Sequence, residues 1–229
     1  FYIGPADGCN FFRLSRASLV RYATDGFSFV PSVARGWEVN GDGSEWTFFL
    51  REGMKWSDGD DFNADDFMWQ YDNVIMNTDL TAGPPPFLAS GDGFGSMSKV
   101  DDTTIKFTFP NPNYLFLETV AQADEACYGS TRNVTFAPEH YMRQFHIDTN
   151  PNAGDLAKSE GFDDWLQLYD DKTSYNNNPD KPAITPRHFE SVLGDDVVRA
   201  ERNPYFWEVD PAGTPLPYID AHTSPLVSS

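Results

Sequence analysis

Residues 31–67 decide the fold of this chain and read PSVARGWEVNGDGSEWTFFLREGMKWSDGDDFNADDF. Apolar and aromatic residues flank the turn residues Asn40 to Gly43, and Asn-Gly and Asp-Gly pairs favour a tight β-hairpin at this point. A second turn at Asp58-Gly59 precedes Asn63, a good helix N-cap. Asp66 stands three residues later, where its carboxylate can complete a capping box. The stretch therefore predicts a hairpin, a turn and a capped helix in succession.

The sequence around this stretch predicts further helices and strands. The capped helix continues with apolar residues at helical spacing, namely Phe67, Met68, Tyr71, Val74 and Ile75. Residues 81–98 are rich in Gly and Pro and are expected to form a long functional or mobile loop. A second hairpin is expected over residues 99–109, short helices over 114–121, 137–145 and 163–169, and a strand over 196–201. This mixture predicts a mixed α/β (α+β) fold.

Composition and charge narrow the class of partner. The 229 residues are 40% hydrophobic and 15% aromatic, which is typical of a chain that folds around a core. Thirty-five acidic residues against 16 basic ones give a net charge of −19, which disfavours nucleic acid and anionic lipid as partners. This charge can increase solubility, adapt the protein to salty surroundings or favour the binding of cationic ligands. No apolar run reaches the roughly 18 residues of a membrane span.

No set of residues in the sequence predicts catalysis. The chain has two cysteines, Cys9 and Cys127, and four histidines, without metal-ligand spacing, so we expect no metal and no cofactor. Whether Cys9 and Cys127 form a disulfide stays open. His140 and His146 are expected in surface or capping roles. We therefore expect a protein that is not an enzyme, with a secreted acidic hydrolase as the rival class.

Aromatic residues fall into two groups. Trp37, Trp46, Trp56 and Trp69 lie in strand or helix patterns and are expected in the core. A second group lies in Pro-rich segments and comprises Tyr205, Phe206, Trp207 and Tyr218. These four side chains either line a ligand surface or hold a loop against the body of the protein.

Residues 31–67 resemble the hallmark region of the peptide/nickel-type extracellular solute-binding proteins of ABC importers (family 5, oligopeptide-binding-like). The shared elements occur in order at Pro31, Ala34 to Trp37, Asp42-Gly43, Thr47 to Arg51, Lys55 to Gly59 and Ala64 to Asp66. Residues 100–109, 136–141, 201–207 and 216–220 are also similar to segments of this family. The family's Gly-Thr-Gly-Pro-Tyr is absent from residues 183–189, as in a divergent branch.

The resemblance implies a lobe of the type II periplasmic-binding-protein kind together with a family-specific accessory domain. Residues 1–9 would belong to the main lobe, 10–112 to the accessory domain with its hairpins and capped helix, and 113–229 to the continuation of the main lobe. Full-length members are much longer, so we expect an N-terminal fragment truncated before the second lobe. The implied location is periplasmic or extracellular, with a lipid anchor in the full-length protein as one alternative.

The implied function is that of the substrate-binding component of an ABC transporter. Such a protein captures oligopeptides or a similar small solute, delivers it to a membrane permease and is expected to be a monomer. An oligosaccharide receptor of the same family is the alternative. The resemblance implies Asp7, Cys9, Asn10, Gln122 and Asp124 as ligand-binding residues, with Asp7 or Asp124 pairing with a peptide amino terminus. We expect the fragment alone to bind weakly or not at all.

Overall fold

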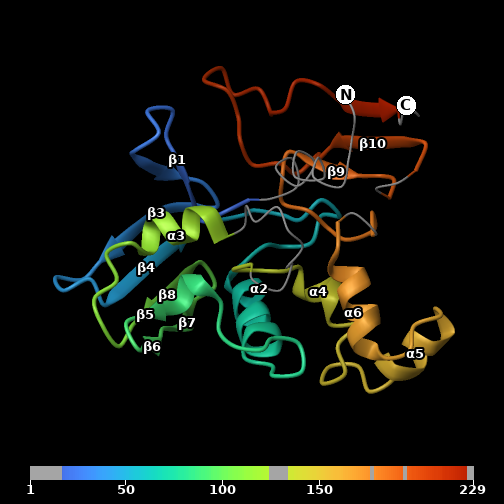
Figure 1. The fold of residues 1–229 in the computed structure, drawn as a ribbon. Helices are drawn as coiled ribbons and strands as arrows, with labels where there is room; N and C mark the ends of the chain where they lie inside the picture. Colours follow the sequence, from blue (N-terminus) through green and yellow to red (C-terminus); the bar gives the residue numbers. More distant parts are fainter. Residues whose placement is uncertain (1–16, 124–133, 176–177, 193–194, 226–229) are drawn as a thin grey trace.

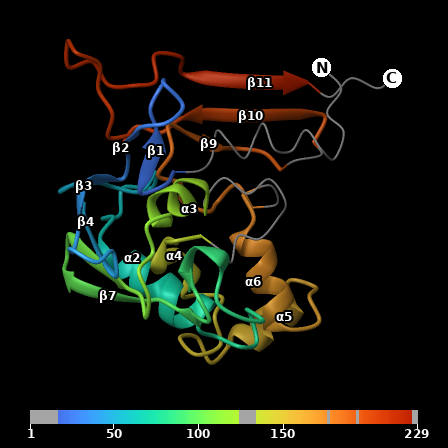
Figure 2. The same cartoon turned by 60° about the vertical axis from the view of Figure 1, so that its left-hand side comes forward.

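The computed structural model describes residues 17–123, 134–175, 178–192 and 195–225. Helices are interspersed between groups of strands along the chain, so the predicted mixed α/β fold is confirmed. A small sheet lies at one end of the molecule and is formed by β9 (Arg187–Phe189), β10 (Val197–Arg202) and β11 (Ala221–Pro225). Three helices lie at the other end, namely α4 (Glu139–Met142), α5 (Ala153–Ser159) and α6 (Trp165–Thr173) (Figure 1, Figure 2). To one side of both, α2 (Ala64–Trp69) and α3 (Phe116–Ala123) pack on a larger sheet (Figure 1).

The larger sheet has four antiparallel strands in the order β3-β4-β8-β7. Their bounds are Ala34–Val39 (β3), Glu45–Leu50 (β4), Ser96–Asp101 (β7) and Thr104–Thr108 (β8). Both predicted hairpins are confirmed, and they join where β4 pairs with β8. Burial alternates along β4, because Trp46, Phe48 and Leu50 point into the core while their neighbours are half-exposed.

The turn of the first hairpin has the chemistry that its residues predict. Gly43 adopts a positive φ of 74°, a conformation that favours glycine. The Asn40 side-chain oxygen accepts hydrogen bonds from the backbone N–H groups of Ser44 (3.0 Å) and Glu45 (3.1 Å). Local side-chain bonds of this kind fix the turn and hence the register of β3 on β4.

The capped helix is also confirmed. It comprises α2 (Ala64–Trp69) and continues directly as a π-helical segment, η1 (Gln70–Ile75). Asn63 is the N-cap, and its backbone N–H donates to Asp66 Oδ2 at 3.0 Å, which completes the predicted capping box. The change to π-helical geometry was not predicted, since the apolar spacing is similar in both kinds of helix.

The expectation of a long loop over residues 81–98 is wrong in part. The segment contains a short 3₁₀ helix, η2 (Pro86–Leu88), followed by the strand pair β5 (Ala89–Ser90) and β6 (Gly93–Phe94). Phe87 and Leu88 are buried and anchor the segment to the main core. Burial of these two apolar side chains outweighs the tendency of the Gly and Pro residues to form irregular structure.

Four α-helices follow or flank the larger sheet in the described part of the chain beyond η1. They are α3 (Phe116–Ala123), α4 (Glu139–Met142), α5 (Ala153–Ser159) and α6 (Trp165–Thr173). Three were predicted, although α4 is shorter than expected. The fourth, α5, was not predicted, and its N-cap residue Asn152 makes no side-chain capping bond. Among the described residues, no helix is both long and apolar enough to cross a membrane.

Two small sheets complete the fold. The first pairs β1 (Val20–Tyr22) with β2 (Phe29–Pro31). The second has the antiparallel order β11-β10-β9, formed by Ala221–Pro225, Val197–Arg202 and Arg187–Phe189. Only β10 of this second sheet was predicted. Strand β11 is exposed along most of its length, so its sequence carries no alternation of apolar residues.

The core consists mainly of two hydrophobic clusters. The larger one includes Trp46 and Trp56 and joins the four-stranded sheet to β1, α2 and α3. The smaller one joins η1 to α4, α5 and α6 and includes Trp69. Three of the four tryptophans predicted in the core are buried, and Trp37 is half-buried against the larger cluster.

We expected His146 at the surface or in a capping role, and the expected surface position is wrong. Its side chain is fully buried, and its ring packs edge-on against Trp69, Trp165 and Tyr169. The ring nitrogen Nε2 lies 2.9 Å from the carbonyl oxygen of Asn73 in η1. The histidine is buried because it satisfies a backbone group of the π-helical segment from a different part of the chain.

Candidate functional site

The residues predicted to bind ligand lie at the margin of the described structure. Asp7, Cys9, Asn10 and Asp124 are outside the described residues. Gln122 belongs to α3, but its side chain is also outside them. The structure therefore leaves these five assignments as predictions. Within the described ranges, no cluster of three or more His, Cys, Asp or Glu side chains could hold a metal ion.

The described residues do form a cavity of about 540 Å³ between the β1–β2 hairpin and residues 204–220, a segment that we call the strap. The strap runs beside this hairpin in both views (Figure 1, Figure 2). The lining residues are Ala17, Ser18, Arg21, Ser32, Pro186, Arg187, Phe206, Trp207, Glu208, Leu216, Pro217, Tyr218 and Ile219. We refer to this space as the arginine cavity, after Arg21 and Arg187.

One end of the strap is held by Asn203. This buried side chain donates from Nδ2 to the carbonyl oxygens of Ala183 (3.2 Å) and Thr185 (3.0 Å). Its Oδ1 accepts the backbone N–H of Tyr205 at 2.9 Å. Because a buried amide with all these partners has few alternatives, the chain direction at the start of the strap is well defined.

The middle of the strap is organised around Asp210. Its Oδ1 accepts the backbone N–H groups of Ala212 and Thr214, each at 2.8 Å, and its Oδ2 accepts the Tyr218 hydroxyl at 2.6 Å. These hydrogen bonds lower the pKa of Asp210, with the Tyr218 bond as the largest cause. The turn therefore brings Tyr218 back toward the first half of the strap, where it lines the cavity.

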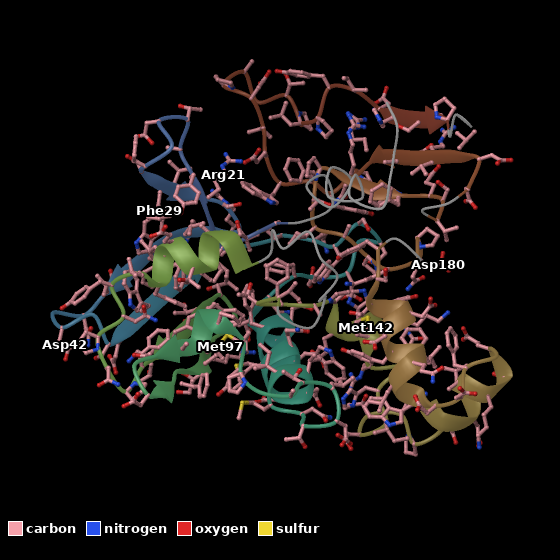
Figure 3. The ribbon with its side chains drawn as sticks, viewed as in Figure 1. Arg21, Phe29, Asp42, Met97, Met142 and Asp180 are labelled. Atoms are coloured by element: carbon pink, nitrogen blue, oxygen red, sulfur yellow. The ribbon has the colours of Figure 1, made fainter. Side chains whose placement is uncertain are left out.

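Charged groups connect the strap to the body of the protein. Arg21 Nη1 lies 2.8 Å from Glu208 Oε1, an ion pair between β1 and the strap. Figure 3 labels Arg21 on the side of the hairpin that faces the strap. The Arg51 guanidinium lies 4.4 Å from the ring centroid of Trp207, and its Nε donates to the Ser32 carbonyl oxygen at 2.8 Å. Arg21 of β1 and Arg51, the residue after β4, thus hold the strap in place.

Within the described structure, two of the lining residues also carry a buried donor without an acceptor. Among the described residues, neither Arg187 Nη1 nor Trp207 Nε1 has a hydrogen-bond partner, although both atoms are buried. A buried donor without an acceptor costs about 1–3 kcal/mol, and more when the group is charged. The wall therefore combines the positive charge of Arg187 with an apolar surface.

Sequence reasoning identified some of the lining residues and missed others. Phe206, Trp207 and Tyr218 line the cavity, as one of the two interpretations of the Pro-rich segments anticipated. Tyr205 does not; it packs against Gly59, where an added Cβ would lie 3.0 Å from the tyrosine hydroxyl. Three charged residues, Arg21, Arg187 and Glu208, were missed. They are far apart in sequence, so no local motif could have grouped them.

Comparison with known proteins places the chain in a family. A model of bacterial extracellular solute-binding proteins, family 5 Middle, matches residues 28–223. The chain therefore belongs to family 5 of the bacterial extracellular solute-binding proteins, as the resemblance of residues 31–67 predicted.

Similar proteins have been characterised as binding proteins. The periplasmic alpha-galactoside-binding protein of Rhizobium meliloti (strain 1021) is 30% identical over 213 residues, 89% of this chain and 26% of that protein. The oligopeptide-binding protein OppA superposes with a TM-score of 0.87 and 32% identity, over 100% of this chain and 34% of that one. The binding protein MelB of Agrobacterium fabrum C58, solved with stachyose, superposes with a TM-score of 0.70 and 26% identity, over 94% of this chain and 30% of that one.

This chain spans about a third or less of the length of these proteins. Family members are extracellular or periplasmic binding proteins, and the relatives named here bind solutes rather than catalyse reactions. The OppA superposition covers the whole chain, so the arrangement of the strap, the hairpins and the helices belongs to a known binding-protein fold.

Proposed function

We propose that the protein carrying this chain is the solute-binding component of an ABC importer and captures oligopeptides or a similar small solute. The observation that carries the proposal is the likeness to the oligopeptide-binding protein OppA, at 32% identity and a TM-score of 0.87 over the entire chain. Capture by such a protein is reversible binding without covalent chemistry, so the proposal includes no enzymatic activity. The partners are the solute and the membrane permease.

The proposal extends to features that the resemblance implies. The ligand-binding residues are Asp7, Cys9, Asn10, Gln122 and Asp124. The accessory domain spans 10–112 and the main lobe 1–9 and 113–229. The protein works as a monomer in the periplasm or outside the cell, with a lipid anchor as one form of attachment, and its net charge of −19 keeps it from nucleic acid.

A second candidate function is the capture of oligosaccharides. It is favoured by the 30% identity to the Rhizobium meliloti alpha-galactoside-binding protein over 89% of this chain and by the likeness to MelB, solved with stachyose. The 15% aromatic content also suits stacking on sugar rings.

Thermal unfolding of the full-length protein with three ligand panels tests the proposal. The panels are di- to hexapeptides, oligosaccharides and metal chelates. A ligand at 100 times its dissociation constant adds about 2.7 kcal/mol to the free energy of unfolding, which is a clear shift in melting temperature. We expect peptides to give the shift. A shift with oligosaccharides alone supports the second candidate. An unchanged melting temperature in all three panels excludes a receptor for these solutes.

A further inference from the structure

We propose that the arginine cavity is a binding site for a small organic carboxylate with an apolar body. The proposal concerns this cavity alone and holds whether the protein imports peptides or oligosaccharides. It rests on the size of the cavity, the charge of its wall and the arrangement of its apolar side chains.

The size of the cavity suits a small molecule. Its volume of about 540 Å³ lies within the roughly 300–1,000 Å³ range of pockets that bury a small organic ligand. The strap that closes one side is fixed by hydrogen bonds at Asn203 and Asp210. A wall fixed in this way costs little conformational entropy when a ligand enters.

The charge of the wall is opposite to that of the protein as a whole. The whole chain has a net charge of −19, yet the charged residues among the described lining are two arginines and one glutamate. Glu208 pairs with Arg21 at 2.8 Å, which leaves the charge of Arg187 unbalanced by any other carboxylate in the lining. Positive charge concentrated in one cavity of so acidic a protein selects an anion.

The chemistry of the donors indicates a carboxylate. Arg187 Nη1 and Trp207 Nε1 are buried donors without acceptors within the described part of the chain. An arginine guanidinium matches the two oxygens of a carboxylate and binds them through parallel hydrogen bonds. A carboxylate in the cavity balances the charge of Arg187, a half-buried residue of its lining.

The remaining wall favours an apolar body on the same ligand. Trp207 and Tyr218 offer aromatic surface, and Leu216, Pro217 and Ile219 add aliphatic surface. Tyr218 and Ile219 are each 65% exposed without a ligand, so a ligand that covers them gains hydrophobic contact. A carboxylate joined to a ring or a branched chain uses both parts of the wall, whereas a simple inorganic anion uses only one.

Titration calorimetry with hippurate and its neutral analogue hippuramide tests the proposal. The two probes have the same ring and differ in the carboxylate. We expect hippurate to bind the full-length protein with sub-millimolar affinity. Hippuramide is expected to bind at least about tenfold more weakly. Equal affinity of the two probes, or no heat from hippurate with folded protein, would overturn the proposal.

Three variants locate the binding. R187Q is expected to weaken hippurate binding about tenfold and leave hippuramide unchanged. R143Q is the matched control, because Arg143 carries the same charge, is 55% exposed and does not line the cavity. E208Q is expected to strengthen hippurate binding several-fold, since it releases Arg21 and removes the negative charge of the wall. An equal effect of R187Q and R143Q, or weaker binding in E208Q, overturns the proposal.

Glycyl-phenylalanine and its C-terminal amide identify the source of the carboxylate. If the dipeptide outcompetes its amide for the hippurate site, the cavity accepts the carboxyl end of a peptide. If neither dipeptide competes with hippurate, the cavity takes a free organic acid. Both results support the carboxylate site. Equal competition by the dipeptide and its amide would contradict a carboxylate-selective site.

Discussion

Asp66 connects three parts of the molecule through one carboxylate. Its Oδ2 accepts the backbone N–H of Asn63 at 3.0 Å and the Trp56 indole N–H at 3.2 Å. Its Oδ1 accepts the backbone N–H of Glu139 at 3.0 Å, at the first residue of α4. The same side chain therefore completes the capping box of α2, satisfies a buried indole and binds the N-terminus of a second helix.

Replacing Asp66 with alanine is expected to lower the free energy of unfolding by about 2 kcal/mol, because three donors lose their acceptor. Asp65 is the matched control: it is the neighbouring aspartate, and its side chain is 52% exposed in an ion pair with Lys99. We expect D65A to cost about 0.5 kcal/mol or less. Urea unfolding of both variants checks this difference, and equal costs would contradict the role of Asp66.

Asp66 also makes stability depend on pH. Burial raises the pKa of Asp66 from 3.8 to about 7, because the loss of hydration outweighs the three hydrogen bonds that lower it. Between these two values the folded state keeps a proton that the unfolded chain releases. The contribution of this group to stability is thus largest below about pH 4 and is lost as the pH rises to about 7.

We expect the free energy of unfolding of the wild type to fall relative to D66N between pH 4 and 7, by on the order of 1 kcal/mol per pH unit. The comparison with D66N separates the effect of Asp66 from that of His146, which both proteins contain. Burial lowers the pKa of His146, so this histidine reduces the free energy of unfolding as the pH falls below 6.5. Urea unfolding across this pH range is the measurement. A constant difference between the two proteins would show that Asp66 does not titrate there.

At the scale of elements, the turn between β3 and β4 is tied to the segment that precedes α3. The Gly43 carbonyl oxygen accepts the backbone N–H of Asn113 at 2.9 Å and the Trp46 indole N–H at 3.3 Å. The Tyr114 ring covers the turn so closely that a Cβ at Gly43 would lie 2.6 Å from its Cε1 atom. The hairpin thus sets the start of α3 as well as its own register.

The variant G43A is expected to lower the free energy of unfolding by about 1–2 kcal/mol, chiefly through strain at positive φ, because the exposed Tyr114 ring can move away from the added Cβ. Gly41 lies in the same turn with open space around it and without positive φ, so G41A is the control and should change stability by about 0.5 kcal/mol or less. Thermal and urea unfolding compare the two. Equal destabilisation would show that neither the φ angle nor the ring contact matters.

Elements with local signals could be predicted from the sequence. The first hairpin and α2 have turn residues and caps within a few positions, and both are confirmed. Strand β11 and the burial of His146 depend on partners distant in sequence, namely β10 and the carbonyl of Asn73. Tertiary contacts of this kind leave no local pattern, so these features could not be predicted.

The candidate site follows the same rule. Aromatic residues of the strap could be proposed as lining residues because they lie together in Pro-rich sequence, and three of them do line the cavity. Arg21 and Arg187 come from β1 and β9 and meet only when the strap folds beside the β1–β2 hairpin. The local aromatic surface could therefore be predicted, whereas the charge that selects a ligand depends on the fold.

At the scale of the whole molecule, a strongly acidic chain folds into a scaffold that superposes on the binding protein OppA over 100% of the chain and 34% of OppA. The sequence motif that identifies the family lies in the hairpin and the capped helix, which are structural elements. The proposed capture of a solute depends instead on how loops and lobes of the complete protein meet around it. Its central test must therefore be direct binding to the full-length protein.

Titration calorimetry of the full-length protein with trialanine, and separately with stachyose, is that test. Trialanine is expected to bind saturably at one site per protein with micromolar affinity, and stachyose is expected to give only heat of dilution. Binding of stachyose without trialanine would contradict peptide capture and support the oligosaccharide function. Heat of dilution for both would contradict capture of either solute.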